Sequence, residues 1–145
     1  MLDFEQVDIT GSRLVGAITE LGHIGPKHHG IIIGCHPIDR KIYVAENRKT
    51  GYQLATVDDF VARYSSMSDV HIFPNNGKFS DVDVAKRALE ELNKGGEGLY
   101  NLAVNNCESF SNRAMHDISA STQVINTAIG VAVLLGAVWY IKKAK

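Results

Sequence analysis

Short apolar runs alternate with turn residues through the first half of the chain. Runs rich in β-branched residues occupy positions 31–34, 42–46 and 70–73, and glycine, proline or asparagine residues stand beside them. Runs of this length and composition are typical of buried β-strands. A further strand is predicted within residues 7–15, ahead of a glycine-rich loop. The pattern therefore predicts several short strands near the start of the chain.

Two other segments have the apolar spacing of α-helices. Residues 81–93 follow the N-cap Ser80, and two glycines follow them. Their apolar residues predict one buried helix face, formed by Val82, Ala85, Ala88, Leu89 and Leu92. Thr56 and Asp59 have the spacing of a capping box and predict a short helix up to Tyr64. Strands and helices together indicate an α+β fold, with an antiparallel sheet packed on helices.

The C-terminal segment has a third pattern, which is apolar on all sides. Residues 118–141 include no charged side chain, and residues 125–141 are almost wholly apolar. At about 1.5 Å per residue, this stretch is long enough for a bilayer core of roughly 30 Å. Trp139 and Tyr140 precede a cluster of lysines, as expected at a membrane interface. We expect a transmembrane helix, and the alternative is a buried core or hairpin helix.

These patterns divide the chain into three parts. We expect a folded domain at residues 1–117, a linker at 118–123 and a single-pass C-terminal membrane anchor at 124–145. A chain of 145 residues normally forms one domain. The anchor also has a row of small residues that favours helix-mediated self-association, formed by Ala128, Ala132 and Gly136.

Composition narrows the classes of function. The net charge of -1 gives no electrostatic basis for binding nucleic acid. The six histidines do not form a His-Glu-x-x-His motif, and the two cysteines are not spaced as metal ligands, so we expect no metal and no cofactor. Cys35 and Cys107 have no evident disulfide role and suit a reducing compartment. No N-terminal signal is evident, so we expect the folded domain to face the cytoplasm.

The run Asn105-Asn106-Cys107-Glu108-Ser109-Phe110 places a cysteine where a loop meets a helix. Residues 99–102 are predicted to lead into it, and Asn106 is a suitable N-cap. A thiol at a helix N-terminus experiences the positive end of the helix dipole, which favours the thiolate. The nearby N–H groups also suit an oxyanion. The alternative is an inert, buried cysteine.

A general base for this cysteine is available upstream, in the run Lys27-His28-His29-Gly30-Ile31-Ile32-Ile33-Gly34. His28 and His29 open the predicted strand, so their side chains point to opposite faces of the sheet. One of them can face a catalytic cleft while the other packs or meets solvent. The alternative for either histidine is a strand-edge residue without a catalytic role.

Together, the His-x-Gly-Ile-x-Ile-Gly strand and the downstream Asn-Cys-Glu-x-Phe motif resemble the lecithin:retinol acyltransferase-like family. This family includes the HRAS-like suppressor phospholipases and acyltransferases, which have a circularly permuted papain-like fold. The resemblance covers about residues 7–117, and residues 56–60 look like the family's short helix after the second strand. It implies that Cys107 is the nucleophile and His28 the general base.

The family's third polar residue, which orients the base, lies on the next strand. The best alignment places Glu46 there, and Asn47 is the competitor one residue along. A carboxylate at this place holds the imidazole tautomer and stabilises the imidazolium. The chain departs from the family at Ser109, where many members have histidine. A solvated strand end is the alternative for Glu46.

The resemblance implies a membrane-anchored thiol acyltransferase or phospholipase A. Such an enzyme passes an acyl group from a glycerophospholipid, through a thioester on Cys107, to water or another acceptor. In this interpretation the membrane anchor supplies local concentration and no chemistry. Two alternatives stay open. One is a papain-like cysteine peptidase or amidase, and the other is a non-catalytic, membrane-tethered binding module.

Overall fold

The computed structural model of the chain describes residues 3–95, 101 and 105–143. It has an α+β fold built on a five-stranded antiparallel sheet with the strand order β4-β3-β2-β1-β5. The strands are β1 (Arg13–Ala17), β2 (Lys27–Cys35), β3 (Ile42–Arg48), β4 (Gly51–Thr56) and β5 (His71–Phe73). The helices are α1 (Val57–Tyr64), α2 (Asp81–Asn93), α3 (Cys107–His116) and α4 (Thr122–Lys143), with a 3-10 turn η1 (Gly22–Ile24).

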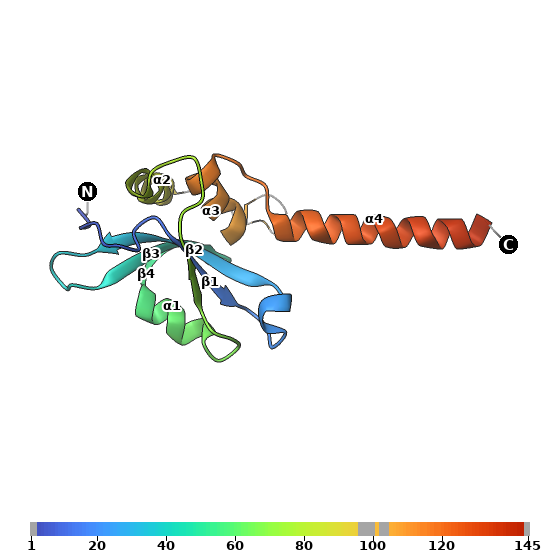
Figure 1. Ribbon diagram of the computed structural model, residues 1–145, viewed down its shortest axis with the longest axis horizontal. Helices are drawn as coiled ribbons and strands as arrows, with labels where there is room; N and C mark the ends of the chain where they lie inside the picture. Colours follow the sequence, from blue (N-terminus) through green and yellow to red (C-terminus); the bar gives the residue numbers. More distant parts are fainter. Residues whose placement is uncertain (1–2, 96–100, 102–104, 144–145) are drawn as a thin grey trace.

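Helices cover both faces of the sheet (Figure 1). The helix α1 packs on one face, and α2 and α3 pack on the other. The alternation of side chains along β2 serves both cores, because adjacent Ile31 and Ile32 point to opposite faces and both are fully buried. Ile31 packs with Phe110 of α3, whereas Ile32 packs with Phe60 of α1. The fully apolar isoleucine run of β2 is thus explained by burial on both sides.

The predicted elements agree with the structure in kind, and they differ in three places. The first strand, β1, lies at the end of the predicted segment and beyond it. The hairpin strand β4 has no counterpart in the prediction, because all six of its residues are half-buried and give no clear alternation. On α2, Ala85 and Ala88 are buried as predicted, but Val82 is exposed and Val84, which was not part of the predicted face, is buried. Residues 99, 100 and 102 of the predicted approach to Cys107, and Gly96, lie outside the described residues.

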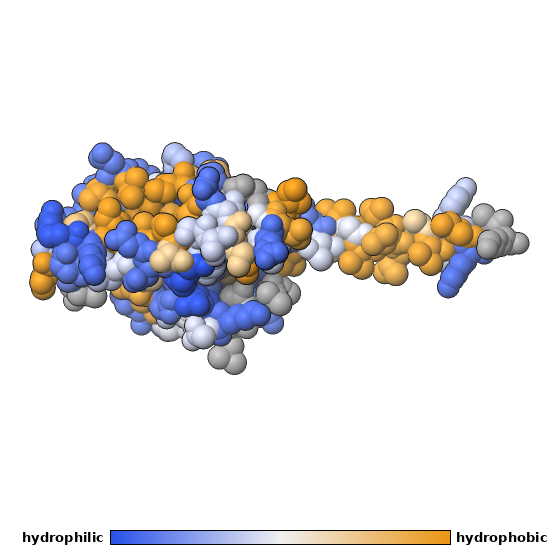
Figure 2. All heavy atoms as spheres, turned by 90° about the horizontal axis from the view of Figure 1, so that it is seen from below, coloured by the Kyte–Doolittle hydropathy of each residue, from blue (hydrophilic) through white to orange (hydrophobic). Residues whose placement is uncertain are grey.

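The C-terminal helix α4 stands apart from both cores. It extends away from the domain, and its surface is largely hydrophobic (Figures 1 and 2). None of its residues is buried, so it is not the core or hairpin helix that the sequence left open. Its 22 residues make it long and apolar enough to cross a membrane. The helix begins at Thr122, inside the segment that the sequence indicated as a linker.

Candidate active site

Cys107 is the first residue of α3, as the sequence predicted. Asn106 is the N-cap, and its side-chain oxygen accepts hydrogen bonds from the main-chain N–H of Ser109 (2.8 Å) and from the Ser109 hydroxyl (3.1 Å). Ser109 is fully buried. Ser109 therefore helps to secure the helix start that carries the thiol.

The Cys107 thiol lies against the main chain at the start of β2. Its sulfur donates to the carbonyl oxygen of Lys27 at 3.7 Å, and the N–H of His29 hydrogen-bonds the sulfur. β3 pairs with β2 only from Gly30 onward, opposite Glu46. The sulfur therefore occupies an edge of β2 that the next strand leaves open, and it contacts the residues on either side of His28.

Burial decides the protonation of this thiol. Cys107 is 4% exposed, and burial raises the pKa of its thiol to about 11, although nearby main-chain N–H groups act in the opposite direction. The sequence predicted a thiolate because a helix N-terminus lowers the pKa of a thiol. In the structure the pKa of Cys107 is raised instead. In the resting protein the group is a neutral thiol at pH 7, so reaction requires a base.

His28 is held by a hydrogen bond to Glu46. The imidazole Nε2 lies 2.6 Å from the Glu46 Oε2 atom, and both side chains are buried. Because Nε2 meets a carboxylate, it bears the proton, and Nδ1 keeps the lone pair that can accept another. The tautomer that the contact favours is the one a general base needs.

The Glu46 carboxylate is fully buried and is bonded from three sides. Arg63 of α1 donates to its Oε1 at 2.5 Å, and Gln53 of β4 donates to the same atom at 2.8 Å. Burial alone raises the pKa of Glu46, but hydrogen bonds from His28, Arg63 and Gln53 lower it to about 2. Glu46 is therefore ionised at neutral pH and keeps a negative charge beside the imidazole.

Aromatic side chains of α1 surround the His28 ring, and two glycines of the sheet allow close packing near it. The ring lies 5.5 Å from the centroid of Phe60 and 5.2 Å from that of Tyr64. A Cβ atom on Gly30 would come within 2.5 Å of Val44, and one on Gly16 within 2.7 Å of Tyr64. The absence of a side chain at Gly16 lets Tyr64 of α1 approach the sheet beside the imidazole, and the absence of one at Gly30 leaves room for Val44 of β3.

His29 has a different environment on the opposite face of the sheet. Its Nδ1 atom is buried without a hydrogen-bond partner among the described residues, and its Nε2 lies 3.4 Å from the Gln123 amide nitrogen. Burial, reinforced by the positive charge of Arg13, lowers the pKa of His29 to about 3. An imidazole with so low a pKa is a poor acceptor for a thiol proton, which favours His28 as the base.

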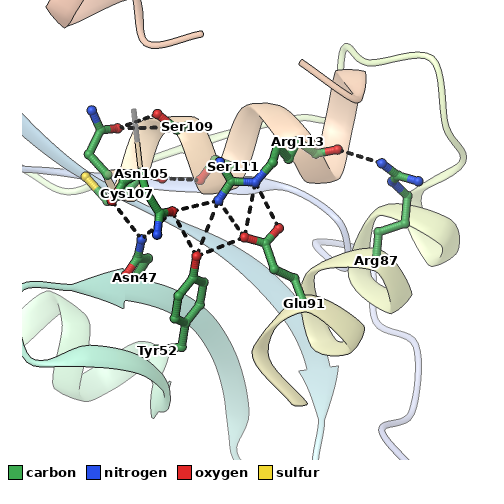
Figure 3. Close-up of polar contacts among 10 residues, drawn as sticks. Asn47, Tyr52, Arg87, Glu91, Asn105, Cys107, Ser109, Ser111 and Arg113 are labelled. Carbon is green, nitrogen blue, oxygen red and sulfur yellow. Dashed lines mark hydrogen bonds and ion pairs between the residues drawn. The ribbon is translucent and has the colours of Figure 1, made fainter. Parts of the chain in front are cut away.

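Asn47 also faces away from His28. Its amide nitrogen donates to the main-chain and side-chain oxygens of Asn105 at 3.3 and 3.2 Å. The Asn105 side chain also accepts from Tyr52 (2.9 Å) and Arg113 (2.9 Å), and both contact Glu91 of α2 (Figure 3). This network holds the residues just before Cys107, so Asn47 contributes to the Cys107 side of the sheet.

The structure thus brings His28 and Glu46 into direct contact and places Cys107 on the main chain that flanks His28. Among the described residues, no hydrogen bond joins the Cys107 thiol to the imidazole. No protein-family model, curated protein or solved structure matches this chain.

Sequence reasoning missed several polar residues of the site. Arg63 and Gln53 contact Glu46, and nothing in the local sequence marks them as partners of a carboxylate. Gln123 was assigned to the linker, yet its side chain accepts from the Lys27 N–H at 2.9 Å. The only sequence signal for Arg63 was its place in the last turn of a predicted helix, where basic residues are common.

A groove of about 480 Å³ opens beside the thiol, and more of its surface is apolar than polar. Residues that flank the β1–β2 loop, the first turns of α4, and Cys107 all line it. The lining residues are Ile18, Pro26, Lys27, Asn106, Cys107, Ser121, Gln123, Val124, Thr127 and Ala128.

Proposed function

We propose that this chain is a membrane-anchored thiol acyltransferase or phospholipase A with a circularly permuted papain-like domain. The observation that carries the proposal is the arrangement around His28. Its imidazole is bonded to the buried, ionised Glu46, and the Cys107 thiol contacts the main chain on both sides of it. The order of the motifs, with histidine before cysteine, is that of the permuted family the sequence resembles.

In the first half-reaction, His28 Nδ1 takes the Cys107 proton as the sulfur attacks the carbonyl carbon of a glycerophospholipid ester. The N–H groups of Cys107 and Glu108, at the start of α3, have no acceptor within the helix and are suited to hold the resulting oxyanion. The carbon–oxygen bond of the ester then breaks, and His28 returns its proton to the leaving alkoxide. The products are a thioester on Cys107 and a lysophospholipid.

The second half-reaction restores the thiol. Water, an alcohol or an amine gives its proton to His28 Nδ1 and attacks the thioester carbon. The carbon–sulfur bond breaks, and the sulfur takes the proton back from His28. Because burial keeps the resting thiol neutral, deprotonation accompanies attack in the first half-reaction and does not precede it. Glu46 stabilises the imidazolium in both halves.

The groove beside Cys107 favours a lipid substrate over a peptide. Its surface is mainly apolar, and one of its sides is the helix that is apolar enough to cross a membrane. A peptidase or amidase would need main-chain donors and acceptors along its cleft to align an extended peptide. A non-catalytic binding module would have no use for an imidazole held by a buried carboxylate.

The anchor part of the proposal is a single pass of α4 through the bilayer, with the folded domain on the cytoplasmic side. We expect alkaline carbonate washing to leave the full-length protein with the membrane, because insertion of so apolar a helix is effectively irreversible. Release of the full-length protein by the wash would contradict the anchor. The row of Ala128, Ala132 and Gly136 lies on an exposed helix and remains a prediction for self-association.

Incubation of the full-length protein in detergent micelles with phospholipid, followed by intact-protein mass spectrometry, tests the chemistry. We expect an acyl adduct on Cys107 that hydroxylamine removes, as it does other thioesters. A matched incubation with peptide or amide substrates separates the alternatives. An adduct from peptide and none from phospholipid would replace the lipid enzyme with a peptidase, and no adduct from either would favour a binding module.

A further inference from the structure

We propose that the membrane helix forms one wall of the acyl-binding site, so that an acyl chain passes directly from the bilayer to Cys107. The groove between Ile18 and Pro26 on one side and Val124 and Ala128 on the other is the path. This inference rests on the proposed function and adds to it where the acyl chain binds. It differs from the sequence-based interpretation, in which the anchor supplied only local concentration.

Polar contacts hold the first turn of α4 to the catalytic centre. The Gln123 side chain accepts from the Lys27 N–H at 2.9 Å and donates to the Lys27 carbonyl at 3.4 Å. The same carbonyl accepts from the Cys107 thiol. The Ser121 hydroxyl donates to the Glu108 carboxylate at 2.5 Å, and the Gln123 N–H donates to it at 3.1 Å. The helix start is therefore fixed to residues that adjoin Cys107.

The Glu108 carboxylate makes this attachment a charged one. Burial raises its pKa, but hydrogen bonds from Ser121 and Gln123 outweigh burial, and the pKa lies below the usual range for glutamate. The ionised carboxylate accepts three hydrogen bonds from the start of the α4 segment. Such charge-assisted bonds are stronger than neutral ones, so the first turn of α4 has a defined position beside the thiol.

The opposite wall of the groove, beside the β1–β2 loop, also has apolar residues suited to contact with a membrane. Ile18 and Pro26 line the groove and flank a loop whose apolar side chains face solvent, with Leu21 67% exposed and Ile24 95% exposed. Figure 1 shows this loop at the end of the domain from which α4 departs. When α4 spans the bilayer, the loop and the groove therefore lie at the membrane surface.

The occupant that best fits this groove is the acyl chain of a lipid. The groove has the volume of a small-molecule site, which is roughly 300–1,000 Å³. It begins where two apolar elements meet the membrane and ends at the thiol that takes the acyl group. An acyl chain that enters here stays in apolar surroundings along its length, whereas a soluble polar substrate gains little from such walls.

Chain-length preference tests the inference with the full-length protein in detergent micelles. The measurement is the rate of acyl-Cys107 formation from decanoyl and butanoyl nitrophenyl esters, followed by mass spectrometry. Ala128→Trp fills the groove from the helix side, and we expect the ratio of decanoyl to butanoyl rates to fall about tenfold or more. Ile18→Trp fills it from the loop side and should lower the same ratio.

Ile129→Trp is the matched control, because Ile129 is the next residue of α4 and does not line the groove. This variant should keep the wild-type ratio within about twofold. Equal losses for both esters in Ala128→Trp and Ile18→Trp, or an unchanged ratio in both, would overturn the groove assignment while the proposed function stands. If the wild-type protein forms no adduct with either ester, the proposed function fails and the groove assignment fails with it.

Discussion

Glu46 and Asn47 are neighbours on β3, yet they belong to different polar networks on opposite faces of the sheet. Glu46 lies on the α1 face, where its carboxylate meets His28, Arg63 and Gln53. Asn47 lies on the α3 face, where its amide binds Asn105, two residues before Cys107. The two networks therefore act on different parts of the candidate site. One favours a single tautomer of His28, and the other holds the start of the helix that carries the Cys107 thiol.

The two networks also differ in how they respond to solvent conditions. The Glu46 network contains a buried carboxylate whose ionisation depends on its neighbours. Asn47 contributes an amide, which does not titrate. A change of pH should therefore act directly on Glu46, whereas loss of the Asn47 amide contact should act on stability at any pH.

The largest expected effect comes from the nucleophile itself. Cys107→Ala should abolish acyl-enzyme formation and preserve the fold, because alanine is small and tolerated at a helix start. Cys35→Ser is the matched control, since Cys35 is also a buried, free cysteine. Mass spectrometry after incubation with phospholipid measures the adduct in both. An adduct on Cys35 in the wild-type protein would overturn the whole site assignment.

The next largest effect separates the two adjacent histidines. His28→Ala should slow acylation by about 10²-fold or more, the usual scale for a lost general base. His29→Ala should slow it much less, because burial lowers the pKa of His29 to about 3 and its imidazole takes up protons poorly. Single-turnover acylation rates and thermal melts of both variants provide the test. Comparable rate losses in two folded variants would show that the base has been misassigned.

Substitutions on β3 compare the two networks directly. Glu46→Gln should slow acylation less than His28→Ala does and should alter the pH dependence of the rate, because an amide stabilises imidazolium poorly. Asn47→Ala should slow acylation less than Glu46→Gln does. It should also lower the free energy of unfolding by about 1–3 kcal/mol, since it removes buried hydrogen bonds. Acylation rates across pH and chemical denaturation measure these effects. A larger rate loss for Asn47→Ala would transfer the orienting role to Asn47.

The last expected effect acts on stability and is confined to acid. The pKa of Glu46 is about 2 in the folded protein and near its ordinary value of 4.5 in the unfolded chain. Its stabilising contribution, about 3 kcal/mol at most, is therefore present above pH 4.5 and lost as the pH falls toward 2. Glu46→Gln should flatten this part of the stability curve, and Asn47→Ala should shift the curve without changing its slope. Denaturation between pH 2 and 6 tests both, and an unchanged slope in Glu46→Gln would contradict the ionised carboxylate.

Local patterns in the sequence were sufficient for much of the fold. The sequence predicted the helix at residues 81–93 and the start of the next helix at Cys107. Both starts depend on a capping residue immediately before the helix, so the local sequence encodes them. The strand β4 was missed because its half-buried residues alternate weakly, and its place is set by pairing with β3. The partners Arg63 and Gln53 come from two separate elements, and only the folded chain brings them to Glu46.

The sequence by itself determined that the chain has strands before a cysteine-bearing helix, and a terminal helix that is apolar on all sides. Both follow from short-range composition and spacing. Tertiary structure decided three further properties. It set the face on which Glu46 and Asn47 lie, because strand register turns successive side chains to opposite sides. It raised the pKa of Cys107, because burial outweighs the helix N-terminus. It also attached α4 to the site, because Gln123 meets Lys27 only after residues 96 positions apart are folded together.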